Sequence, residues 1–388
     1  MGKIHNFERG LERANVLLEN AKISTSDKRL IERFVQYQAA QGIGKGRLIA
    51  YTGTLRLIAE RHLQGKGYQG LVRDDLIEIV AGIEGSKLGD WGKYGYKTVL
   101  KSFYEWQGKH ELISWMRIRK KPKSSKLPES MPREQEVMQM INAAYTSRDE
   151  AAIATLYEGG FRVGEFGGLN IGDITFDRYG AIAIVDGKTG MRRVRLIFAM
   201  PYIAKWLEEH PLRDDPRAPL WIKLDGSGER MLYSAIYRQL KRIGERAGVH
   251  KRVNPHNFRH ARSTHLASKL TESQMEEYLG WVQGSNMPSI YVHMSGRDLD
   301  ADLLKMYGMA PEEEDQKEEL TTLQCPHCKA LNTVGARICI NCRKPLAVEE
   351  VMDLEEKTMK MFQNFMELFE QHPEAMEQFK KIIKPKND

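Results

Sequence analysis

The sequence predicts a mainly α-helical protein with one small β-sheet, divided into more than one domain. Apolar residues recur at helical spacing through residues 27–115 and again from residue 233 onward. Two short β-rich runs, 181–185 and 193–198, flank the turn Asp-Gly-Lys-Thr-Gly, a pattern typical of a hairpin. At 388 residues the chain is long enough for two or three domains. We therefore expect a helical N-terminal domain followed by an α+β domain.

Four amphipathic segments fill the N-terminal part of the chain. The first follows Asp27, which we expect to cap its N-terminus, and the others cover about 48–59, 71–83 and 96–106. Glycine-rich breaks separate these segments. Four helices joined by short loops predict a compact bundle.

A basic segment with three prolines, residues 117–132, follows the bundle. Six of its first ten residues are Lys or Arg, and proline discourages regular structure. We expect a linker that can follow a phosphate backbone, although an ordinary solvated linker would have the same composition. Its candidate DNA contacts are Arg117, Arg119, Lys120, Lys121 and Lys123.

Residues 133–308 predict the mixed α+β domain. Helices are expected at 133–144, at 149–158 and again from Tyr233 onward. The hairpin, between the helix expected at 149–158 and those from Tyr233 onward, would place Lys188 at the tip of a loop. From there its side chain could reach into a groove of a binding partner. Lysines are common in hairpins, and Arg192 and Arg193 lie nearby, so this position is the least specific of those considered below.

Five motifs in this domain carry basic and aromatic groups in an informative order. They are EGGFRVGE with Arg162, DGKTG with Lys188, NPHNFRHARSTHL with His256 and Arg259, LGW with Trp281, and SIYVHM with Tyr291. Singly, each has a simpler explanation, such as a surface arginine, a solvated pair on one helix face or a core aromatic. Their joint order favours a catalytic set. These motifs contain three further histidines, which we expect to pack or cap rather than to catalyse: His260, His265 and His293.

These residue types suit the transfer of a phosphodiester to a protein nucleophile. A tyrosine phenol, with a usual pKa of about 10, must lose its proton to attack phosphorus. Two guanidiniums can clamp the phosphate oxygens as negative charge develops. A lysine can protonate the departing 5′-oxygen, and a histidine can shuttle the tyrosine proton or bond the phosphate. This chemistry requires no metal. From the sequence we expect Tyr291 to be exposed.

Over roughly residues 25–310, the chain resembles the tyrosine recombinase family, the phage-type integrases and Xer-like recombinases. The resemblance makes Arg162 the first arginine with Glu165 as its acidic neighbour, and His256 and Arg259 the His-x-x-Arg pair. It also places Lys188 in the β-hairpin lysine position, Trp281 in the His/Trp position and Tyr291 as nucleophile. There are two departures: position 281 is more often histidine, and the spacing from 281 to 291 is one residue longer than usual.

The resemblance implies a site-specific DNA recombinase or integrase that acts through a 3′-phosphotyrosine. It further implies double-stranded DNA with an inverted-repeat core site, bound by two protomers, and four protomers in synapsis. Two alternatives remain open. The first is a type IB topoisomerase, against which the helical N-terminal domain and short hairpin argue. The second is a non-enzymatic DNA-binding regulator, against which the intact catalytic set argues.

The distribution of charge agrees with a DNA-binding N-terminal part. Residues 1–308 contain 48 basic and 36 acidic residues, whereas residues 309–388 contain 11 and 16. A basic excess supplies non-specific affinity for phosphates, although a modest excess can also serve only solubility. No run of about 20 apolar residues and no secretory signal is present, so we expect a cytoplasmic protein.

Four cysteines near the C-terminus form two Cys-x-x-Cys pairs: Cys325, Cys328, Cys339 and Cys342. This pattern predicts a small ribbon that holds structural Zn²⁺ through four thiolates. The span is too short for a core of its own, so metal binding would supply its folding energy. A redox pair or a chance pattern is the alternative.

Residues 349–388 carry a wide apolar face on one or two helices, interrupted near Pro373. That much apolar surface predicts burial against another protomer, the catalytic domain or a partner. The ribbon and this tail are not standard in bacterial members of the family and suit a chain from an archaeon, its virus or its plasmid. The expected domains are a helical core-binding domain at 1–116, the linker at 117–132, the catalytic domain at 133–308, the ribbon at 321–346 and the tail at 349–388.

Overall fold

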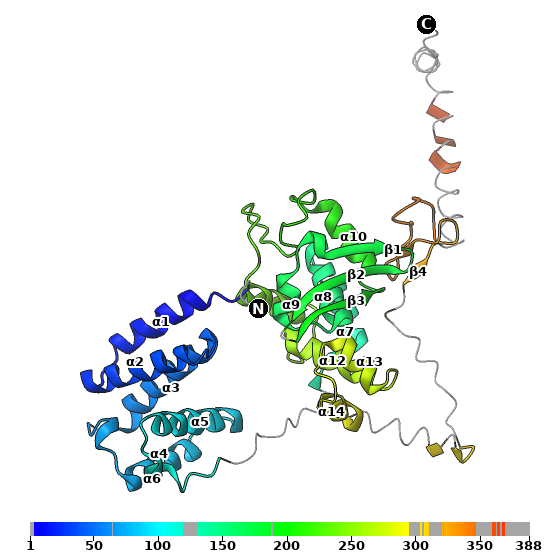
Figure 1. Ribbon diagram of the computed structural model, residues 1–388. Coiled ribbons are helices and arrows are strands. Elements are labelled where there is room, and N and C mark those ends of the chain that lie inside the picture. Colours follow the sequence, from blue (N-terminus) through cyan, green and yellow to red (C-terminus); the bar gives the residue numbers. More distant parts are fainter. Residues whose placement is uncertain are drawn as a thin grey trace. The chain divides into compact units, whose positions relative to one another are not determined.

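The structure of the chain is a computed structural model (Figure 1). It describes residues 4–63, 65–118, 130–187, 189–294, 303–304, 306–309, 320, 322–346, 359–361, 363–364 and 367–368. The chain forms two compact units, Met1–Leu127 and Pro128–Asp388. The division falls inside the segment predicted as a linker.

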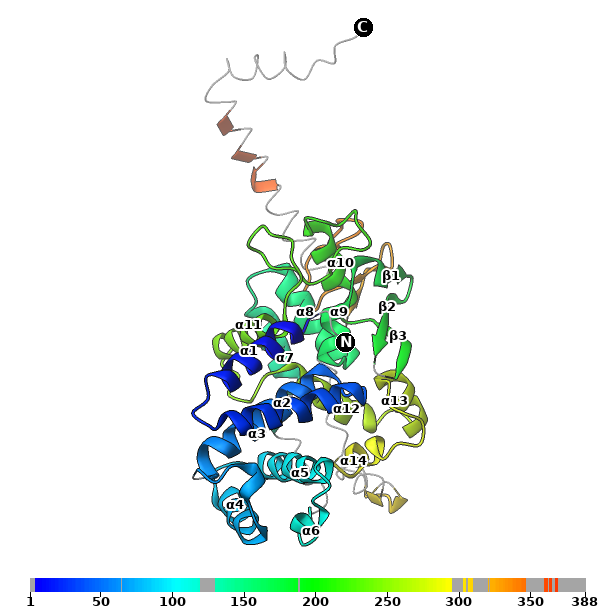
Figure 2. The same ribbon diagram turned by 60° about the vertical axis from the view of Figure 1, so that its left-hand side comes forward.

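The first unit is helical. Its elements are α1 (Phe7–Glu19), α2 (Thr25–Ala40), α3 (Lys45–His62), the 3₁₀ turn η1 (Tyr68–Gly70), α4 (Arg73–Gly85), α5 (Asp90–Trp106) and the short α6 (His110–Ile113). Helix α3 packs against α1, α2 and α5, and the group α1 to α3 is the upper layer of this unit in Figure 2. Phe34 and Phe103 meet edge to face at the centre of the core.

Two details of this unit differ from the prediction. Helix α1 was not expected as a separate element, and α2 is capped by Ser24, whose Oγ accepts a hydrogen bond from the Asp27 N–H at 3.0 Å. Asp27 is instead buried in the first turn, where its carboxylate accepts hydrogen bonds from Ser24 Oγ and from the Tyr68 N–H, each at 2.7 Å. A tertiary contact 41 residues away therefore decides its role.

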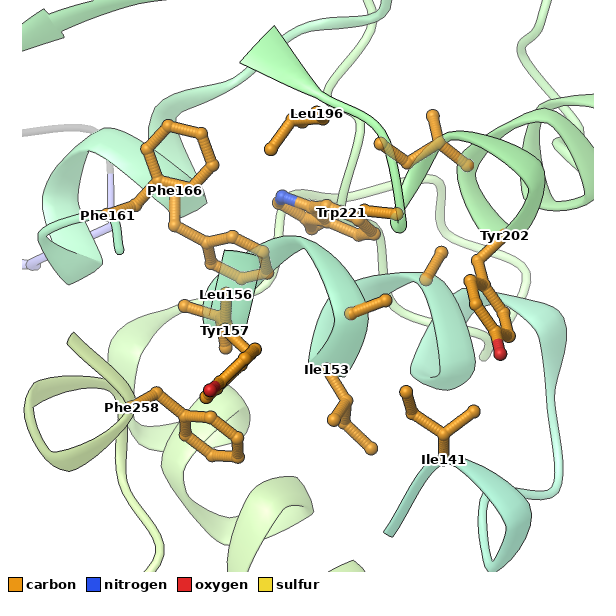
Figure 3. Close-up of a cluster of buried hydrophobic side chains, with 14 of the residues drawn as sticks. Ile141, Ile153, Leu156, Tyr157, Phe161, Phe166, Leu196, Tyr202, Trp221 and Phe258 are labelled. Atoms are coloured by element: carbon orange, nitrogen blue, oxygen red, sulfur yellow. The ribbon is translucent and has the colours of Figure 1, made fainter. Parts of the chain in front are cut away.

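The second unit surrounds helix α8. Its helices are α7 (Glu134–Asn142), α8 (Ser147–Gly159), α9 (Val163–Gly168), α10 (Met200–Glu209), α11 (Tyr233–Arg246), α12 (Pro255–Ala267), α13 (Glu272–Leu279) and α14 (Met287–Met294). Helix α8 contacts α7, α10 and α12 and is buried along most of its length. Ile153, Leu156 and Tyr157 project from it into the core, which also contains the stacked pair Phe166 and Trp221 (Figure 3).

A three-stranded antiparallel sheet lies on one side of α8. Its strands are β1 (Ile174–Asp177), β2 (Gly180–Gly187) and β3 (Gly190–Leu196), in the order β1-β2-β3. The hairpin predicted around the Asp-Gly-Lys-Thr-Gly turn is β2–β3, with Val185 opposite Arg192 and Gly187 opposite Gly190. Strand β1 was not predicted, because its four residues, mostly exposed, give no clear periodic signal.

The cysteine segment contains a two-residue antiparallel pair, β4 (Leu323–Gln324) and β5 (Leu331–Asn332). Strand β5 contacts α10, and both Leu320 and Val334 pack against the core around α8. The ribbon is therefore attached to the second unit by apolar contacts. In the described part of the tail, Met361 and Leu368 are helical and exposed, 63% and 49% respectively. Among the described residues, no helix is long and apolar enough to cross a membrane.

Candidate active site

Arg162 lies at the start of α9, and its guanidinium is held at two points. Nη1 donates to Glu165 Oε1 and Nη2 donates to Gly280 O, both at 2.7 Å. The Arg162 N–H also donates to Glu165 Oε2 at 2.9 Å, so the Glu165 side chain satisfies a free backbone donor at the beginning of the helix. The side chain remains 27% exposed. A guanidinium fixed in direction and still open to solvent can bind an anion.

Glu165 is almost fully buried and binds two arginines. Its second carboxylate oxygen accepts a hydrogen bond from Arg192 Nη2 at 2.7 Å, across from Arg162. Burial alone would raise the pKa of this carboxyl, but the charge of Arg192 and the hydrogen bonds from Arg162 outweigh it. The pKa of Glu165 is therefore lowered from its ordinary value. Glu165 stays ionised and fixes both guanidiniums.

Arg192 is the basic residue that sequence reasoning mentioned only as a neighbour of Lys188. It lies on β3 opposite Val185, its side chain is only 8% exposed, and it also donates from Nη1 to Tyr278 O at the end of α13. Its Nε has no hydrogen-bond partner within the described chain. The signal that could have identified it is the alternation of β3, which turns Arg192 and Val194 to the same face of the sheet.

Arg259 lies on α12 and is buried. Nη1 donates to Gly160 O at 2.7 Å and Nη2 donates to Leu279 O at 2.6 Å. Burial, followed by the positive charge of Arg162, lowers the pKa of this guanidinium to about 10. It remains charged at neutral pH, in a place where two arginines repel each other. Repulsion between the two guanidiniums raises the free energy of the unbound protein, and an anion bound between them would offset that repulsion.

The short loop after α13 brings these groups together. Gly280 ends the helix in the left-handed conformation, with φ of +63°, and its carbonyl accepts from both Arg162 and Thr189. A Cβ at this position would lie 2.7 Å from Cδ and Nε of Arg192. Glycine is therefore required here for both backbone conformation and space.

Tyr291, on α14, is 2% exposed, so the expectation of an exposed tyrosine was wrong. Its ring stacks on Trp281 with centroids 5.4 Å apart and planes 9° apart, and the Arg259 guanidinium lies over the Trp281 ring, 5.6 Å from its centroid. Burial raises the pKa of the Tyr291 phenol to about 12, against the opposing effects of Arg259 and a hydrogen bond with Ser263. The phenol is thus protonated at neutral pH.

Two histidines one turn apart on α12 connect the phenol to the surface. Tyr291 Oη lies 2.5 Å from His260 Nδ1, and His260 Nε2 lies 2.7 Å from Nε2 of His256. His256 is exposed. The sequence prediction that His260 packs or caps missed this contact. The available signal was the spacing of four between His256 and His260, which places both rings on one helix face.

The structure brings together six of the predicted residues: Arg162, Glu165, His256, Arg259, Trp281 and Tyr291. Lys188 lies outside the described residues, as do Arg119, Lys120, Lys121 and Lys123. Arg117 is described and exposed, after α6.

The four cysteines form a separate cluster whose sulfur atoms all lie within 4.8 Å of one another. The Sγ atoms of Cys325 and Cys342 are 3.6 Å apart, as are those of Cys328 and Cys339. A tetrahedral zinc with bonds of about 2.3 Å requires sulfurs about 3.8 Å apart. The residues therefore fit a metal ion with four sulfur ligands.

Part of the second unit is similar to known proteins. Residues 131–297 match the model of the phage integrase family. The chain is 27% identical over 280 residues to the tyrosine recombinase XerA of Pyrococcus furiosus, which covers 70% of this chain and 91% of that protein. It is 25% identical over 296 residues to the tyrosine recombinase XerD of Ralstonia nicotianae, with coverage of 71% and 93%.

Solved structures share the fold. A XerH site-specific recombinase bound to a palindromic difH substrate superposes with a TM-score of 0.56 and 18% identity, covering 78% of this chain and 95% of that one. A lambda integrase dimer bound to a core site gives a TM-score of 0.56 with 16% identity, covering 74% and 81%. At these identities the likeness concerns architecture alone.

Proposed function

The chain belongs to the tyrosine recombinase family of DNA strand-breaking and rejoining enzymes, and on that premise we propose that Tyr291 is its nucleophile. In this proposal Tyr291 Oη attacks a DNA phosphate, forms a 3′-phosphotyrosine and releases a 5′-hydroxyl. The covalent bond conserves the energy of the phosphodiester, so the strand can be rejoined without ATP. The observation that carries the proposal is a buried phenol beside a buried arginine and a histidine chain.

Arg162 and Arg259 are proposed to clamp the non-bridging oxygens of the phosphate. Their charges repel each other in the free protein, and the pentacoordinate transition state supplies the extra negative charge that both can bind. Glu165 is proposed to orient Arg162. Trp281 is proposed to hold the tyrosine ring by stacking.

His256 and Lys188 are proposed to handle protons. His256 is exposed at the edge of the site, where it could bond the phosphate or receive a proton. Lys188 is proposed as the general acid for the departing 5′-oxygen. That role comes from its place in the hairpin motif of the sequence alone.

We propose that the four cysteines hold one structural Zn²⁺. Their sulfur spacing supports this, as does the symmetry of the two knuckles: the N–H of Lys329 bonds Cys325 O, and the N–H of Arg343 bonds Cys339 O. Zinc bound there would stabilise the ribbon. It takes no part in the proposed cleavage.

The proposed substrate is double-stranded DNA with inverted-repeat core sequences, bound by a dimer and joined in a tetramer. Similar structures support this proposal: XerH on a palindromic substrate, a lambda integrase dimer on a core site and a lambda integrase tetramer on a Holliday junction. The basic linker, including Arg117, would add phosphate contacts. The proposal places the protein in the cytoplasm, where it can reach DNA.

Trapping a covalent adduct tests the proposed nucleophile. The protein is incubated with a pool of nicked duplexes of random core sequence, denatured with SDS, and the bound DNA is recovered and sequenced. When a strand is cut a few nucleotides on the 5′ side of the nick, the short fragment that carries the new 5′-hydroxyl diffuses away, so the adduct accumulates. Wild-type protein should form adducts, and Tyr291→Phe should bind DNA but form none. Tyr307→Phe, at a tyrosine that is 74% exposed, is the control and should react normally. Full adduct formation by Tyr291→Phe would refute the assignment.

A further inference from the structure

His260 lies between the proposed nucleophile and His256. Its Nδ1 is 2.5 Å from Tyr291 Oη, and its Nε2 is 2.7 Å from Nε2 of His256. The rings of the two histidines have centroids 4.1 Å apart. Hydrogen-bonding atoms thus run without a gap from a buried phenol to an exposed imidazole.

The tautomers along this chain follow from its geometry. When the phenol donates to Nδ1 of His260, the single ring proton of a neutral His260 lies on Nε2. That N–H donates to Nε2 of His256, whose own proton is then on Nδ1. Each imidazole can accept a proton on one nitrogen and release one from the other.

The phenol needs such a base. Tyr291 is 2% exposed and its pKa is raised to about 12 by burial. At pH 7 only about one molecule in 10⁵ would carry the phenolate spontaneously. Ser263 also bonds the phenol, but a serine hydroxyl is not a base at neutral pH. Among the described neighbours of Tyr291 Oη, the imidazole of His260 is the group able to accept the proton.

We propose that His260 is the general base that removes the proton of Tyr291 during strand cleavage, with His256 as the next acceptor in a relay. The inference rests on the proposed function, because it takes Tyr291 as the nucleophile. It assigns the direct contact with the phenol to a histidine of the motif NPHNFRHARSTHL that the predicted catalytic set left out.

The step balances as follows. Tyr291 Oη forms a bond to phosphorus while its proton moves to Nδ1 of His260. The proton on Nε2 of His260 moves to Nε2 of His256, which becomes an imidazolium at the exposed end. The bond between phosphorus and the 5′-oxygen breaks, and that oxygen takes a proton from the general acid. Strand rejoining reverses each transfer.

The variant His260→Gln tests the relay. Glutamine can keep a hydrogen bond to the phenol but cannot take up its proton. The test uses nicked duplexes of the sequences recovered from adducts of the wild-type protein. On these duplexes, the single-turnover rate of adduct formation should fall by about 100-fold, the usual contribution of a general base, while DNA binding should not change. His265→Gln is the matched control, because His265 lies on the same helix and contacts Glu134 instead. It should cleave at the wild-type rate.

A more acidic nucleophile separates proton transfer from positioning. Replacing Tyr291 by 3,5-difluorotyrosine lowers the pKa of the phenol, so the base matters less. The ratio of adduct-formation rates between the protein with His260 and its His260→Gln variant should then be at least tenfold smaller with difluorotyrosine at position 291 than with tyrosine. A second variant, His260→Ala, should be accelerated by free imidazole, which can enter the space left by the ring.

Three results would overturn the inference: His260→Gln within twofold of wild type, an equal defect with tyrosine and difluorotyrosine, or no imidazole rescue of a folded His260→Ala. Failure of the proposed function would look different. In that case Tyr291→Phe would still form adducts, whatever the His260 variants do.

Discussion

Arg162 and Arg259 donate hydrogen bonds to consecutive carbonyls, those of Gly280 and Leu279, at the C-terminal end of α13. Arg192 donates to the carbonyl before them, that of Tyr278. Helix C-terminal carbonyls lack partners within the helix and carry partial negative charge. One helix end therefore aligns three arginines that come from three separate segments, and so places their charges around one point.

The arginine pair gives the first prediction. Arg162→Ala or Arg259→Ala should slow adduct formation by about 10² to 10³-fold, because each removes a donor to the transition state. DNA affinity should fall far less, since many other cations contact phosphates. Gel-shift and single-turnover adduct assays measure the two effects, with Arg217→Ala, an exposed arginine of a surface loop, as control. Equal losses of binding and cleavage would make these residues general DNA contacts.

The second prediction concerns Glu165 and pH. Glu165→Gln removes the charge that two arginines share, which should destabilise the second unit by about 3 kcal/mol, as expected for breaking a buried ion pair. The folded pKa of Glu165 lies below its unfolded value of about 4.3. Its stabilising contribution is therefore complete above pH 4.3 and is lost as pH falls through the folded pKa.

Thermal melts of wild type and Glu165→Gln between pH 3 and 7 test this. The difference in Tm should be largest at neutral pH and shrink in acid. The control variant is Glu208→Gln, at an exposed carboxylate on α10. Its Tm should equal that of wild type throughout this pH range. A gap between the two melts that stays constant with pH would contradict the role given to Glu165.

Gly280 gives the third prediction. Gly280→Ala forces a Cβ against Arg192 at 2.7 Å and a left-handed backbone on alanine. We expect at least tenfold slower adduct formation and a lower Tm. The control is Gly248→Ala, where φ is +70° and no atom lies within 4 Å of the added Cβ. It carries the backbone strain without the collision, so similar cleavage rates for the two variants would refute the steric argument.

Metal dependence gives the fourth prediction. Adduct formation should persist in EDTA, because arginine and histidine side chains do the proposed chemistry. The purified protein should contain about one zinc per chain, as a single four-cysteine site requires. Cys339→Ser should lose the zinc and expose residues 322–346 to proteolysis, while leaving adduct formation by the second unit measurable. A strict Mg²⁺ requirement for cleavage would contradict the mechanism.

The tail gives the fifth prediction. Its described residues Met361 and Leu368 are exposed in the single chain, so we expect the apolar face to pack on a second protomer. Deleting residues 349–388 should then leave single-site binding and nicking intact and impair assembly on paired sites, measured by analytical ultracentrifugation. Lower stability with unchanged assembly would instead indicate packing within one chain.

Local patterns in the sequence determined the elements and the family. The helical pattern placed α2 to α5, α7 and α8, and the resemblance of the His-x-x-Arg motif predicted α12. The glycine turn placed the β2–β3 hairpin, and the paired cysteines indicated the ribbon. The motifs around Arg162, Arg259 and Tyr291 predicted the chemistry that the proposed function assigns to them, because the residue types and their order suit phosphodiester transfer. Such signals are short in range, so they can be read without a structure.

Only the tertiary structure decided how these groups interact. The burial of Tyr291 depends on stacking with Trp281 from another segment, and the contact with His260 depends on how α14 packs on α12. Arg192 enters the site because the register of β3 turns it toward the end of α13. These outcomes depend on contacts between residues far apart in sequence, whose geometry no local pattern of charge or hydrophobicity encodes.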